Sequence, residues 1–475
     1  MNIQNPSTKP QGWGKSILWL GLAVACFHAA YTSTRFPAAG LLIFGYAFGL
    51  VRLTDQPGVR RAFYFGLATG FLCYAPQLFF FWHIFNAGAI ALWLVLAFWI
   101  GLFTAIVCGC IRRWGKVKTM WLVPIIWTGL EYFRSELYFL KFSWLNVGYA
   151  FQDYLITPFV SYGMYGAGFL VFATVTIVFC RSHIKRVVVD WLVVLMIVVV
   201  FGAYATQLFA GLGFSDARPV PRPSIVGIQM EFPSPNVLPE ALNKALGKNP
   251  DAQIFVLSEY TLDGPVPDSL KQWCRENARY LVVGGKDPVG TNDYYNTAFV
   301  VGTNGEIVFH QAKSVPIQFF KDGLPAPKQE VWNSPWGKIG ICICYDLSYT
   351  RVTDRLVDEG AQLLIVPTMD VEEWGRNEHE LHSRVAPVRA AEYGIPIFRL
   401  ASSGISQAVH WNGNIVTQTS FPGSVEILSA KLLLPMRSSL PLDRLLAPVC
   451  VGITAIVLLT LLVLDWQAGR VRSKS

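Results

Sequence analysis

Long apolar runs fill both ends of this chain, and a region of alternating apolar and polar residues lies between them. Most of the apolar blocks approach the roughly 20 residues that an α-helix needs to cross a bilayer. We therefore expect eight membrane-spanning helices, seven before residue 210 and one near the C-terminus. The second block is short, and Glu131 and Arg134 interrupt the fifth. The blocks lie at about 16–33, 37–52, 62–82, 88–111, 119–137, 156–180, 186–207 and 445–465.

Between the seventh and eighth blocks, strand-like segments alternate with helix-like segments. This alternation predicts a layered α/β domain with functional residues at the ends of strands. We expect a seven-span domain over 1–210, a globular α/β domain over 222–432, and a final span over 445–465 followed by a basic tail. The predicted strands are 224–230, 252–259, 280–287, 294–302, 306–313, 338–345, 361–368, 396–402, 405–411 and one after the turn 411–414, and the predicted helices are 268–279, 349–359 and 377–393.

Basic residues are shared unevenly between the loops that join the apolar blocks. Because Lys and Arg accumulate in cytoplasmic loops, the pattern predicts cytoplasmic N- and C-termini and an extracytoplasmic segment over 208–444. Placing that segment in the cytoplasm would reverse the bias in nearly every loop. The predicted inside loops and tail hold Arg52, Arg60, Arg61, Arg112, Arg113, Lys116, Lys118, Arg181, Lys185, Arg186, Arg470, Arg472 and Lys474, whereas the short outside loops hold Arg35, Arg134 and Lys141.

Composition agrees with a membrane protein. Of 475 residues, 53% are hydrophobic and 15% are charged, whereas a soluble domain has about a quarter charged residues. The net charge is +8, but the basic residues lie in short loops, which favours membrane orientation over nucleic-acid binding. Six of the nine cysteines lie in apolar blocks, and no CxxC pair or Cys/His metal spacing occurs. We expect no disulfide framework, metal, cofactor or nucleic-acid partner.

Three residues of the globular segment could form and break an acyl-thioester. Cys344 offers a nucleophile, Glu259 a base and Lys313 a fixed positive charge. Cys344 lies at a predicted strand-to-helix turn. Cys342 would share its strand face, but it lies deeper in the strand and is predicted to be core. Taken singly, the cysteine could be packing, the glutamate a cap and the lysine a solvated charge; the catalytic interpretation depends on their occurring together.

The segments around these residues resemble the nitrilase, or carbon–nitrogen hydrolase, superfamily. The matching pieces are VLSE ending at Glu259, GEIV leading to Lys313, and GKIGICICYD around Cys344, followed by a helix and LLIVPT. Glu, Lys and Cys occur in that family's order. The resemblance implies an α-β-β-α sandwich and assigns the catalytic roles to Glu259, Lys313 and Cys344.

The rest of the chain resembles the bacterial apolipoprotein N-acyltransferases. FSWLNVGYAFQDY (142–154), GMYGAGFLV (163–171) and HSRVAPVRAAEYGIPIFRLASSGIS (382–406) carry this resemblance. It implies a multi-pass protein of the bacterial inner membrane. Its acyl donor would be a phospholipid, its intermediate a thioester on Cys344, and its acceptor the α-amine of a diacylglyceryl apolipoprotein.

The chain departs from the family at two places. The family usually has a glutamate shortly after the lysine, whereas VPIQFFKDG (315–323) offers Gln318 and Phe319, with Asp322 as another candidate. The family's CYE is CYD here, with Asp346. Further candidates are apolar residues for lipid entry, which could equally be core, a tyrosine beside the nucleophile and a histidine on a predicted helix. These supporting candidates are Phe319, Phe320, Trp374, Tyr345 and His382.

Three functions are therefore compatible with the sequence. The first is N-acyl transfer from a phospholipid to an apolipoprotein. The second is a membrane-tethered amidase of the nitrilase type, in which water accepts the acyl group from a small or lipidic amide. The third is a catalytically silent membrane protein.

Overall fold

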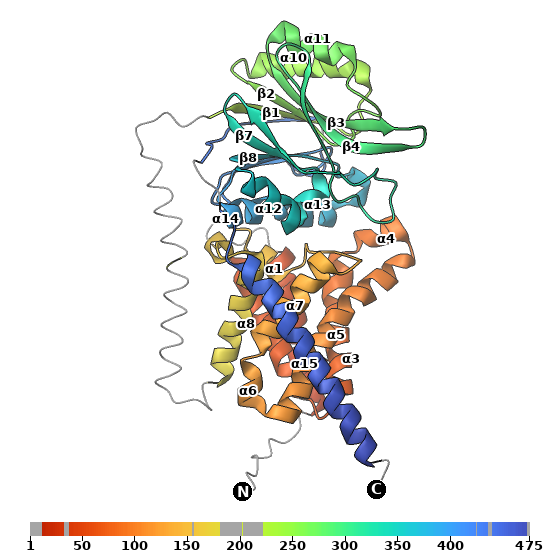
Figure 1. Cartoon of the computed structure of the whole chain (residues 1–475), viewed down its shortest axis with the longest axis vertical. Helices are drawn as coiled ribbons and strands as arrows, with labels where there is room; N and C mark the ends of the chain where they lie inside the picture. Colours follow the sequence, from red (N-terminus) through yellow and green to blue (C-terminus); the bar gives the residue numbers. More distant parts are fainter. Residues whose placement is uncertain are drawn as a thin grey trace.

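The computed structural model describes residues 12–32, 38–153, 156–180, 202, 222–423, 425–435 and 439–472. Figure 1 shows a helical part, which carries both ends of the chain, and an α/β part stacked on it. The span predicted at 186–207 lies outside the described residues, apart from residue 202.

The apolar blocks that are described fold as helices. Segments of three of them, Trp13–Tyr31, Gly88–Trp114 and Asp443–Ala468, are long and apolar enough to cross a membrane. The second and sixth blocks form shorter apolar helices, Ala39–Leu53 and Met164–Cys180. The predicted total of eight spans stays a prediction. The helical elements are α1 (Trp13–Thr32), η1 (Ala39–Leu42), α2 (Ile43–Leu53), α3 (Val59–Gln77), α4 (Phe80–Phe85), α5 (Gly88–Trp114), α6 (Lys116–Met120), α7 (Val123–Tyr132), η2 (Phe133–Leu137), η3 (Val147–Phe151), η4 (Thr157–Val160), α8 (Met164–Cys180) and α15 (Asp443–Arg472).

The fifth apolar block is divided among α6, α7 and η2, and its charged residues point inward. The buried Arg134 donates hydrogen bonds to the Tyr74 hydroxyl (3.1 Å) and to the Asn146 side chain. Glu131 accepts a hydrogen bond of 2.9 Å from the Val147 amide. Charged groups in an apolar helix bundle are tolerated when protein partners replace water in this way.

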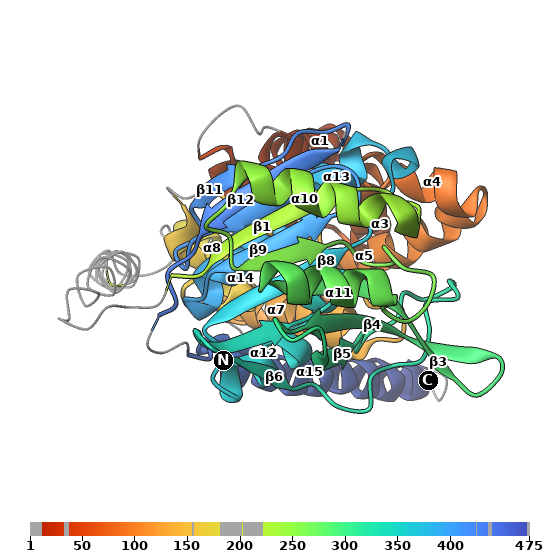
Figure 2. The ribbon, with the colours of Figure 1, turned by 90° about the horizontal axis from the view of Figure 1, so that it is seen from above.

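The α/β part has four layers, as the sequence predicts for a nitrilase-like sandwich. Its two six-stranded sheets have the orders β12-β1-β2-β3-β4-β5 and β11-β10-β9-β8-β7-β6. Figures 1 and 2 show α10 and α11 on the outer face of the first sheet and α12, α13 and α14 beneath the second. The strands are β1 (Ser224–Gln229), β2 (Ile254–Leu257), β3 (Tyr280–Val289), β4 (Asp293–Val301), β5 (Ile307–Ala312), β6 (Val331–Ser334), β7 (Gly337–Ile341), β8 (Leu363–Thr368), β9 (Ile397–Ala401), β10 (Gln407–Val409), β11 (Ile415–Gln418) and β12 (Glu426–Lys431), and the helical elements are η6 (Pro235–Val237), α10 (Leu238–Lys248), α11 (Asp268–Asn277), η7 (Cys344–Ser348), α12 (Thr350–Asp358), η8 (Glu372–Trp374), α13 (Arg376–Ser383) and α14 (Val385–Tyr393).

Most predicted strands occur within a few residues of their expected bounds, but some elements differ. The single helix expected at 377–393 is divided at Arg384 into α13 and α14. Strands β6 and β12 and helix α10 were not predicted. Both strands are short outer strands, each pairing antiparallel with its neighbour, so little of their length forms the apolar run that marks a buried strand.

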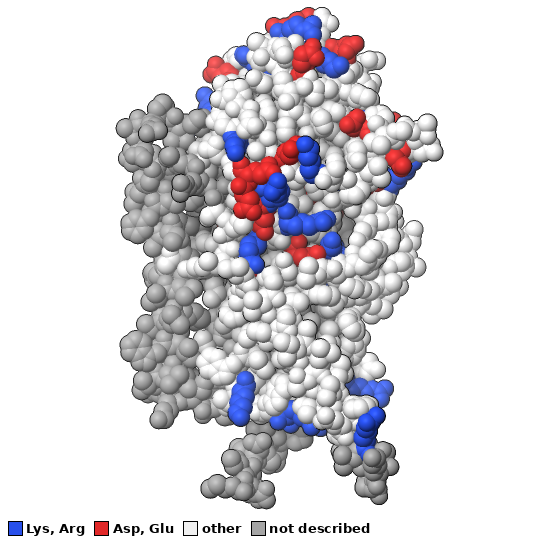
Figure 3. Space-filling model, in the orientation of Figure 1, with Lys and Arg blue, Asp and Glu red and all other residues white. Residues whose placement is uncertain are grey.

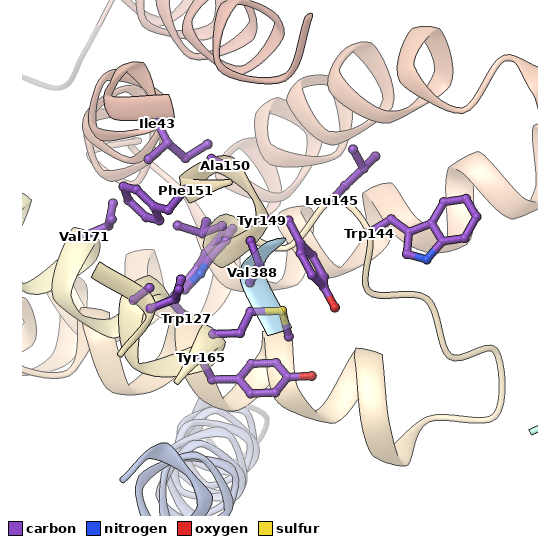
Figure 4. Packing of buried hydrophobic residues seen from close by; sticks show 14 of the residues in the cluster. Ile43, Trp127, Trp144, Leu145, Tyr149, Ala150, Phe151, Tyr165, Val171 and Val388 are labelled. Carbon is purple, nitrogen blue, oxygen red and sulfur yellow. The ribbon is translucent and has the colours of Figure 1, made fainter. Parts of the chain in front are cut away.

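Three apolar clusters hold the layers together. One lies between the two sheets and includes Val256, Ile341 and Ile365; a second packs the first sheet against α10 and α11. The third joins the lower face of the second sheet and its helices to the helical part without a break. Figure 4 shows Val388 of α14 beside Tyr149 and Tyr165 of the helical part. The α/β part is therefore packed directly on the helical part through a shared apolar core.

Candidate active site

Cys344 lies three residues beyond the end of β7, at the first position of the 3-10 turn η7. Its backbone φ is +53°, a left-handed conformation that side-chain-bearing residues rarely adopt and that is often found at functional sites. The side chain is buried, and its Sγ lies 3.9 Å from the Met369 carbonyl oxygen. Burial and then the Glu259 carboxylate raise the pKa of the Cys344 thiol well above its ordinary value. The resting thiol is therefore protonated and needs a base before it can attack.

Lys313 and Glu259 lie together beside this thiol. Lys313 Nζ is 2.8 Å from Glu259 Oε1 and 2.8 Å from Asp322 Oδ2, and its side chain is fully buried. Asn296 joins the two acids, because its Nδ2 donates to Glu259 Oε1 (2.6 Å) and to Asp322 Oδ1 (3.0 Å). The Met369 amide donates to Glu259 Oε2 at 2.8 Å. The three residues predicted for catalysis are thus brought together from strands and loops far apart in the sequence.

The two acids stabilise the charged form of the buried Lys313. Burial alone would lower the pKa of Lys313, but the Glu259 and Asp322 carboxylates raise it well above its ordinary value. Burial by itself would raise the pKa of Asp322, but the Lys313 ammonium lowers it below its usual range. Lys313 therefore carries a fixed positive charge at neutral pH.

The second side chain that pairs with Lys313 is Asp322, and not Gln318. Asp322 also accepts hydrogen bonds from the Tyr260 hydroxyl (2.8 Å) and the Ile317 amide (2.7 Å). Gln318 instead donates its side-chain amide to the Phe139 carbonyl oxygen, away from Lys313. The sequence left both candidates open, because both residues lie in the loop after Lys313 and the course of a loop cannot be read from its sequence.

Asp346 joins the turn η7, which begins at Cys344, to the loop that follows Lys313. Its carboxylate accepts hydrogen bonds from the backbone amides of Val315 (2.7 Å), Ser314 (3.0 Å) and Ile343 (3.2 Å). Burial raises the pKa of Asp346 to about 6, although the amide of Ser314 and the charge of Lys313 oppose the shift. Lys313 directly precedes Ser314, so these hydrogen bonds also hold the backbone beside the lysine in place.

An apolar cavity of about 160 Å³ opens beside Cys344 between the two parts of the molecule. The helical part contributes α4, the start of α5 and the loop at 140–144. The α/β part contributes the segment that follows Lys313 and residues near the nucleophile. Phe85 of α4 packs against Phe319 and Phe320, with ring centroids 6.0 Å and 5.8 Å apart. The predicted supporting residues that line this cavity are Gln318, Phe319, Phe320, Tyr345, Trp374 and His382.

His382 is buried against the nucleophile on the side of α13. Its Nδ1 lies 2.7 Å from Asp370 Oδ1, and Arg399 pairs with the other oxygen of Asp370. The Trp144 ring stacks on the imidazole with centroids 4.5 Å apart. Burial by itself would lower the pKa of His382, but the Asp370 carboxylate raises it above its ordinary value.

Two groups of described residues bring three possible metal ligands within 4.8 Å of one another. They are Cys344, Asp370 and His382, and Asp370, Glu378 and His379. Asp370 belongs to both groups and already binds Arg399 and His382, so we assign no metal to either.

Sequence reasoning missed several residues of this site. Asp370 lies two residues after the end of β8, so a polar residue at a strand end was an available signal. The others lie in the middle of a strand, in a loop or, for Glu378, on helix α13, where nothing in the pattern marks them. The missed residues are Tyr260, Asn296, Glu378 and Arg399 together with Asp370.

The two paired sheets between helical layers, with a buried Cys, Lys and Glu at strand ends, are those of a carbon–nitrogen hydrolase. The family model described as carbon-nitrogen hydrolase matches residues 236–436. A second model, the apolipoprotein N-acyltransferase N-terminal domain, matches residues 23–177. The two models together cover most of the chain, including both of its parts. The chain belongs to the apolipoprotein N-acyltransferase family within the carbon–nitrogen hydrolase superfamily, and it is an acyltransferase.

Two curated apolipoprotein N-acyltransferases are similar to this chain over most of its length. An apolipoprotein N-acyltransferase of Geobacter metallireducens is 24% identical over 82% of this chain and 85% of its own length. One from Shewanella oneidensis is 24% identical over 83% of this chain and 87% of its own length. An omega-amidase of Xenopus laevis is 27% identical over only 27% of this chain and 49% of its own length. Among solved structures, the nitrilase-superfamily member Nit3 of Saccharomyces cerevisiae is 20% identical, with a TM-score of 0.40, and the match covers 46% of this chain and 93% of that one.

Proposed function

We propose that this enzyme moves an acyl chain from a phospholipid to the α-amine of the diacylglyceryl cysteine that begins an apolipoprotein. The observation that carries the proposal is the apolar cavity that joins Cys344 to α4 and α5 of the helical part. A small-amide hydrolase has no need of an apolar chamber that continues into membrane helices. Family membership and the full-length relatives agree with this choice.

In the first half-reaction, Glu259 would take the proton of the Cys344 thiol. The thiolate would then attack the ester carbonyl of the phospholipid, while the Lys313 ammonium stabilises the oxyanion that develops. The ester C–O bond breaks, the lysophospholipid leaves as its alcohol with the proton that Glu259 had taken, and the acyl group remains on Cys344 as a thioester. The fixed charge of Lys313 and its place between Glu259 and Asp322 support these roles.

In the second half-reaction, the acceptor's amine would attack the thioester and release the Cys344 sulfur. An amide is more stable than a thioester, so this transfer needs no nucleotide. Two half-reactions through one covalent intermediate imply ping-pong kinetics. No cofactor is part of the proposal.

The proposed location is the bacterial inner membrane, with cytoplasmic termini and an extracytoplasmic α/β part. The uneven distribution of loop charges supports this orientation. Figure 3 shows a face of the helical part that is nearly free of charged residues, with Lys and Arg gathered at the end where both termini lie. That end would face the cytoplasm, and the cavity beside Cys344 would lie at the outer surface of the bilayer.

The test is acylation of the full-length chain, in detergent micelles, by a phospholipid with a labelled acyl chain. We expect a label on the wild-type protein that neutral hydroxylamine removes, as it removes a thioester. Cys344→Ala should take up no label, whereas the matched control Cys342→Ala, two residues away in the core, should be labelled like wild type. Turnover of small amides without any lipid label would instead identify a hydrolase.

A further inference from the structure

Glu378 is a buried acid whose charge has no donor among the described residues. It lies on α13, its side chain is 1% exposed, and it lines the same cavity as Cys344. Neither carboxylate oxygen accepts a hydrogen bond from a described residue. A buried carboxylate without donors is costly, and such a group in a native protein calls for an explanation.

The two histidines nearest to Glu378 do not satisfy it. Its Oε1 is 3.6 Å from His382 Nδ1, and its Oε2 is 3.8 Å from His379 Nε2. His382 Nδ1 lies closer to Asp370 Oδ1 (2.7 Å), and His379 Nε2 closer to the Val371 carbonyl oxygen (3.0 Å). Both nitrogens therefore have a better partner elsewhere.

His382 offers a second unpartnered polar atom in the same cavity, because its Nε2 is buried without a partner among the described residues. In the neutral ring that donates its Nδ1 proton to Asp370, this Nε2 carries a lone pair and can accept a proton. A ring nitrogen of His382, an Asp370 oxygen and Cys344 Sγ lie within 4.8 Å of one another. His382 thus lies next to Cys344, and Glu378 lines the same cavity, which is otherwise mostly apolar.

We propose that Glu378 and His382 form the amine-binding subsite of this active site, where they receive the α-ammonium group of the acceptor and take its proton. An ammonium group supplies three N–H donors and a positive charge, which is what a buried carboxylate and a free imidazole nitrogen lack. Burial and then Asp370 raise the pKa of Glu378, so its carboxylate accepts a proton readily. The proposal rests on the proposed function and adds residues that recognise the acceptor.

In the proposed transfer, two of the three ammonium protons leave the acceptor nitrogen. The ammonium group loses one proton to the Glu378–His382 pair, which passes it to solvent. The neutral nitrogen forms a bond to the thioester carbonyl carbon, the C–S bond breaks, and its electron pair stays on the Cys344 sulfur. A second N–H proton returns to that sulfur through Glu259, and the third hydrogen remains on the product amide.

The test separates the two half-reactions in the full-length protein. The acceptor is a diacylglyceryl lipopeptide with a free α-amine. In Glu378→Gln, transfer of the labelled acyl group from the enzyme to this lipopeptide should fall by about tenfold or more, beyond any change in acylation by phospholipid. The KM for the lipopeptide should rise. Glu378→Asp should recover much of the loss. The matched control Glu380→Gln, which removes a partly exposed acid of the same helix, should transfer like wild type. Equal transfer by Glu378→Gln and wild type, or an equal loss in both half-reactions, would overturn the proposal.

Binding provides a second measurement that does not depend on chemistry. Cys344→Ala should bind the free-amine lipopeptide about tenfold more tightly than its N-acetylated form. Adding Glu378→Gln should abolish that difference, and an unchanged difference would contradict the subsite. If wild type forms no acyl-enzyme from phospholipid at all, the proposed function fails first, and the subsite fails with it.

Discussion

Lys313 is a fully buried cation, and its position depends on two carboxylates that approach it from different loops. Asp322→Asn keeps the shape but removes one of the two charges. We expect acyl-enzyme formation to fall on the order of 100-fold, because the lysine would move from the position in which it stabilises the oxyanion. Acyl-enzyme formation should fall much less in Gln318→Ala, because the Gln318 side chain donates to the Phe139 carbonyl oxygen instead of binding Lys313. Equal losses in the two variants, measured by phospholipid labelling, would refute the assignment of Asp322.

Asp346 should give the protein a measurable pH dependence of stability. Burial raises its pKa to about 6, above the roughly 3.9 of an unfolded aspartate. The folded protein therefore binds this proton more tightly, so the contribution to stability is fully present below about pH 4 and is lost as the pH rises through about 6. The difference corresponds to on the order of 3 kcal/mol.

Asp346→Asn cannot titrate and should lose this part of the slope. The measurement is the unfolding midpoint of detergent-solubilised wild type and variant at pH 4.5 and pH 7.5. Wild type should lose more stability than the variant over this interval. The same slope in both proteins would show that Asp346 does not titrate as its burial predicts.

At the scale of elements, the segment after Lys313 and helix α4 form one apolar entrance. Phe319 is 66% exposed and adopts a φ of +70°, yet its ring meets Phe85 of α4, as does that of Phe320. An exposed aromatic pair is unfavourable in water but suits contact with lipid. This segment belongs to the α/β part, whereas α4 belongs to the helical part.

Replacing both Phe319 and Phe320 with Ser should raise the KM for a long-chain phospholipid by about tenfold, because the contacts of the two exposed rings with the acyl chain together contribute about 1.4 kcal/mol. Acylation by a short, water-soluble ester should change little. Val289→Ser, at the far end of the β3–β4 hairpin, is the control for a simple loss of exposed apolar surface. A similar loss with both donors would indicate a general effect on folding.

At the scale of the whole molecule, Arg444 joins the last helix to the α/β part. It lies at the second position of α15 and pairs with Asp354 of α12 (2.8 Å) and Glu392 of α14 (3.0 Å). Glu392 in turn accepts a hydrogen bond of 3.0 Å from the Met164 amide, at the start of α8. One largely buried arginine thus fixes two membrane-region helices against two helices beneath the second sheet.

Arg444→Gln should destabilise the protein by about 3–5 kcal/mol, because it removes the arginine that pairs with Asp354 and with the buried Asp443, whereas Glu392 keeps its pair with Arg389. The loss should appear as a lower unfolding temperature and as faster proteolysis of the detergent-solubilised chain. Arg470→Gln is the matched control, since this arginine lies over the Trp466 ring at the exposed end of the same helix. Equal unfolding temperatures for Arg444→Gln and wild type would rule out the proposed role.

Most of the fold was predictable because its signals are local. Apolar runs of helical length marked α1, α5 and α15, and short apolar runs marked the buried strands of both sheets. Strands β6 and β12 were missed because only one residue of β6 and two of β12 are buried, so no apolar run marks them. The break at Arg384 was missed because both halves, α13 and α14, have ordinary helical composition.

By itself, the sequence determined a membrane-embedded helical part, a nitrilase-like α/β part, and Glu259, Lys313 and Cys344 as the catalytic candidates, because each of these depends on residue type and short-range pattern. Only the tertiary structure decided which acid accompanies Lys313, and it brought His382 to Cys344 and Glu378 to the same cavity. It also showed that one cavity is lined by both parts of the molecule. These features depend on how loops distant in the sequence return to one another, and that is set by packing across the whole molecule.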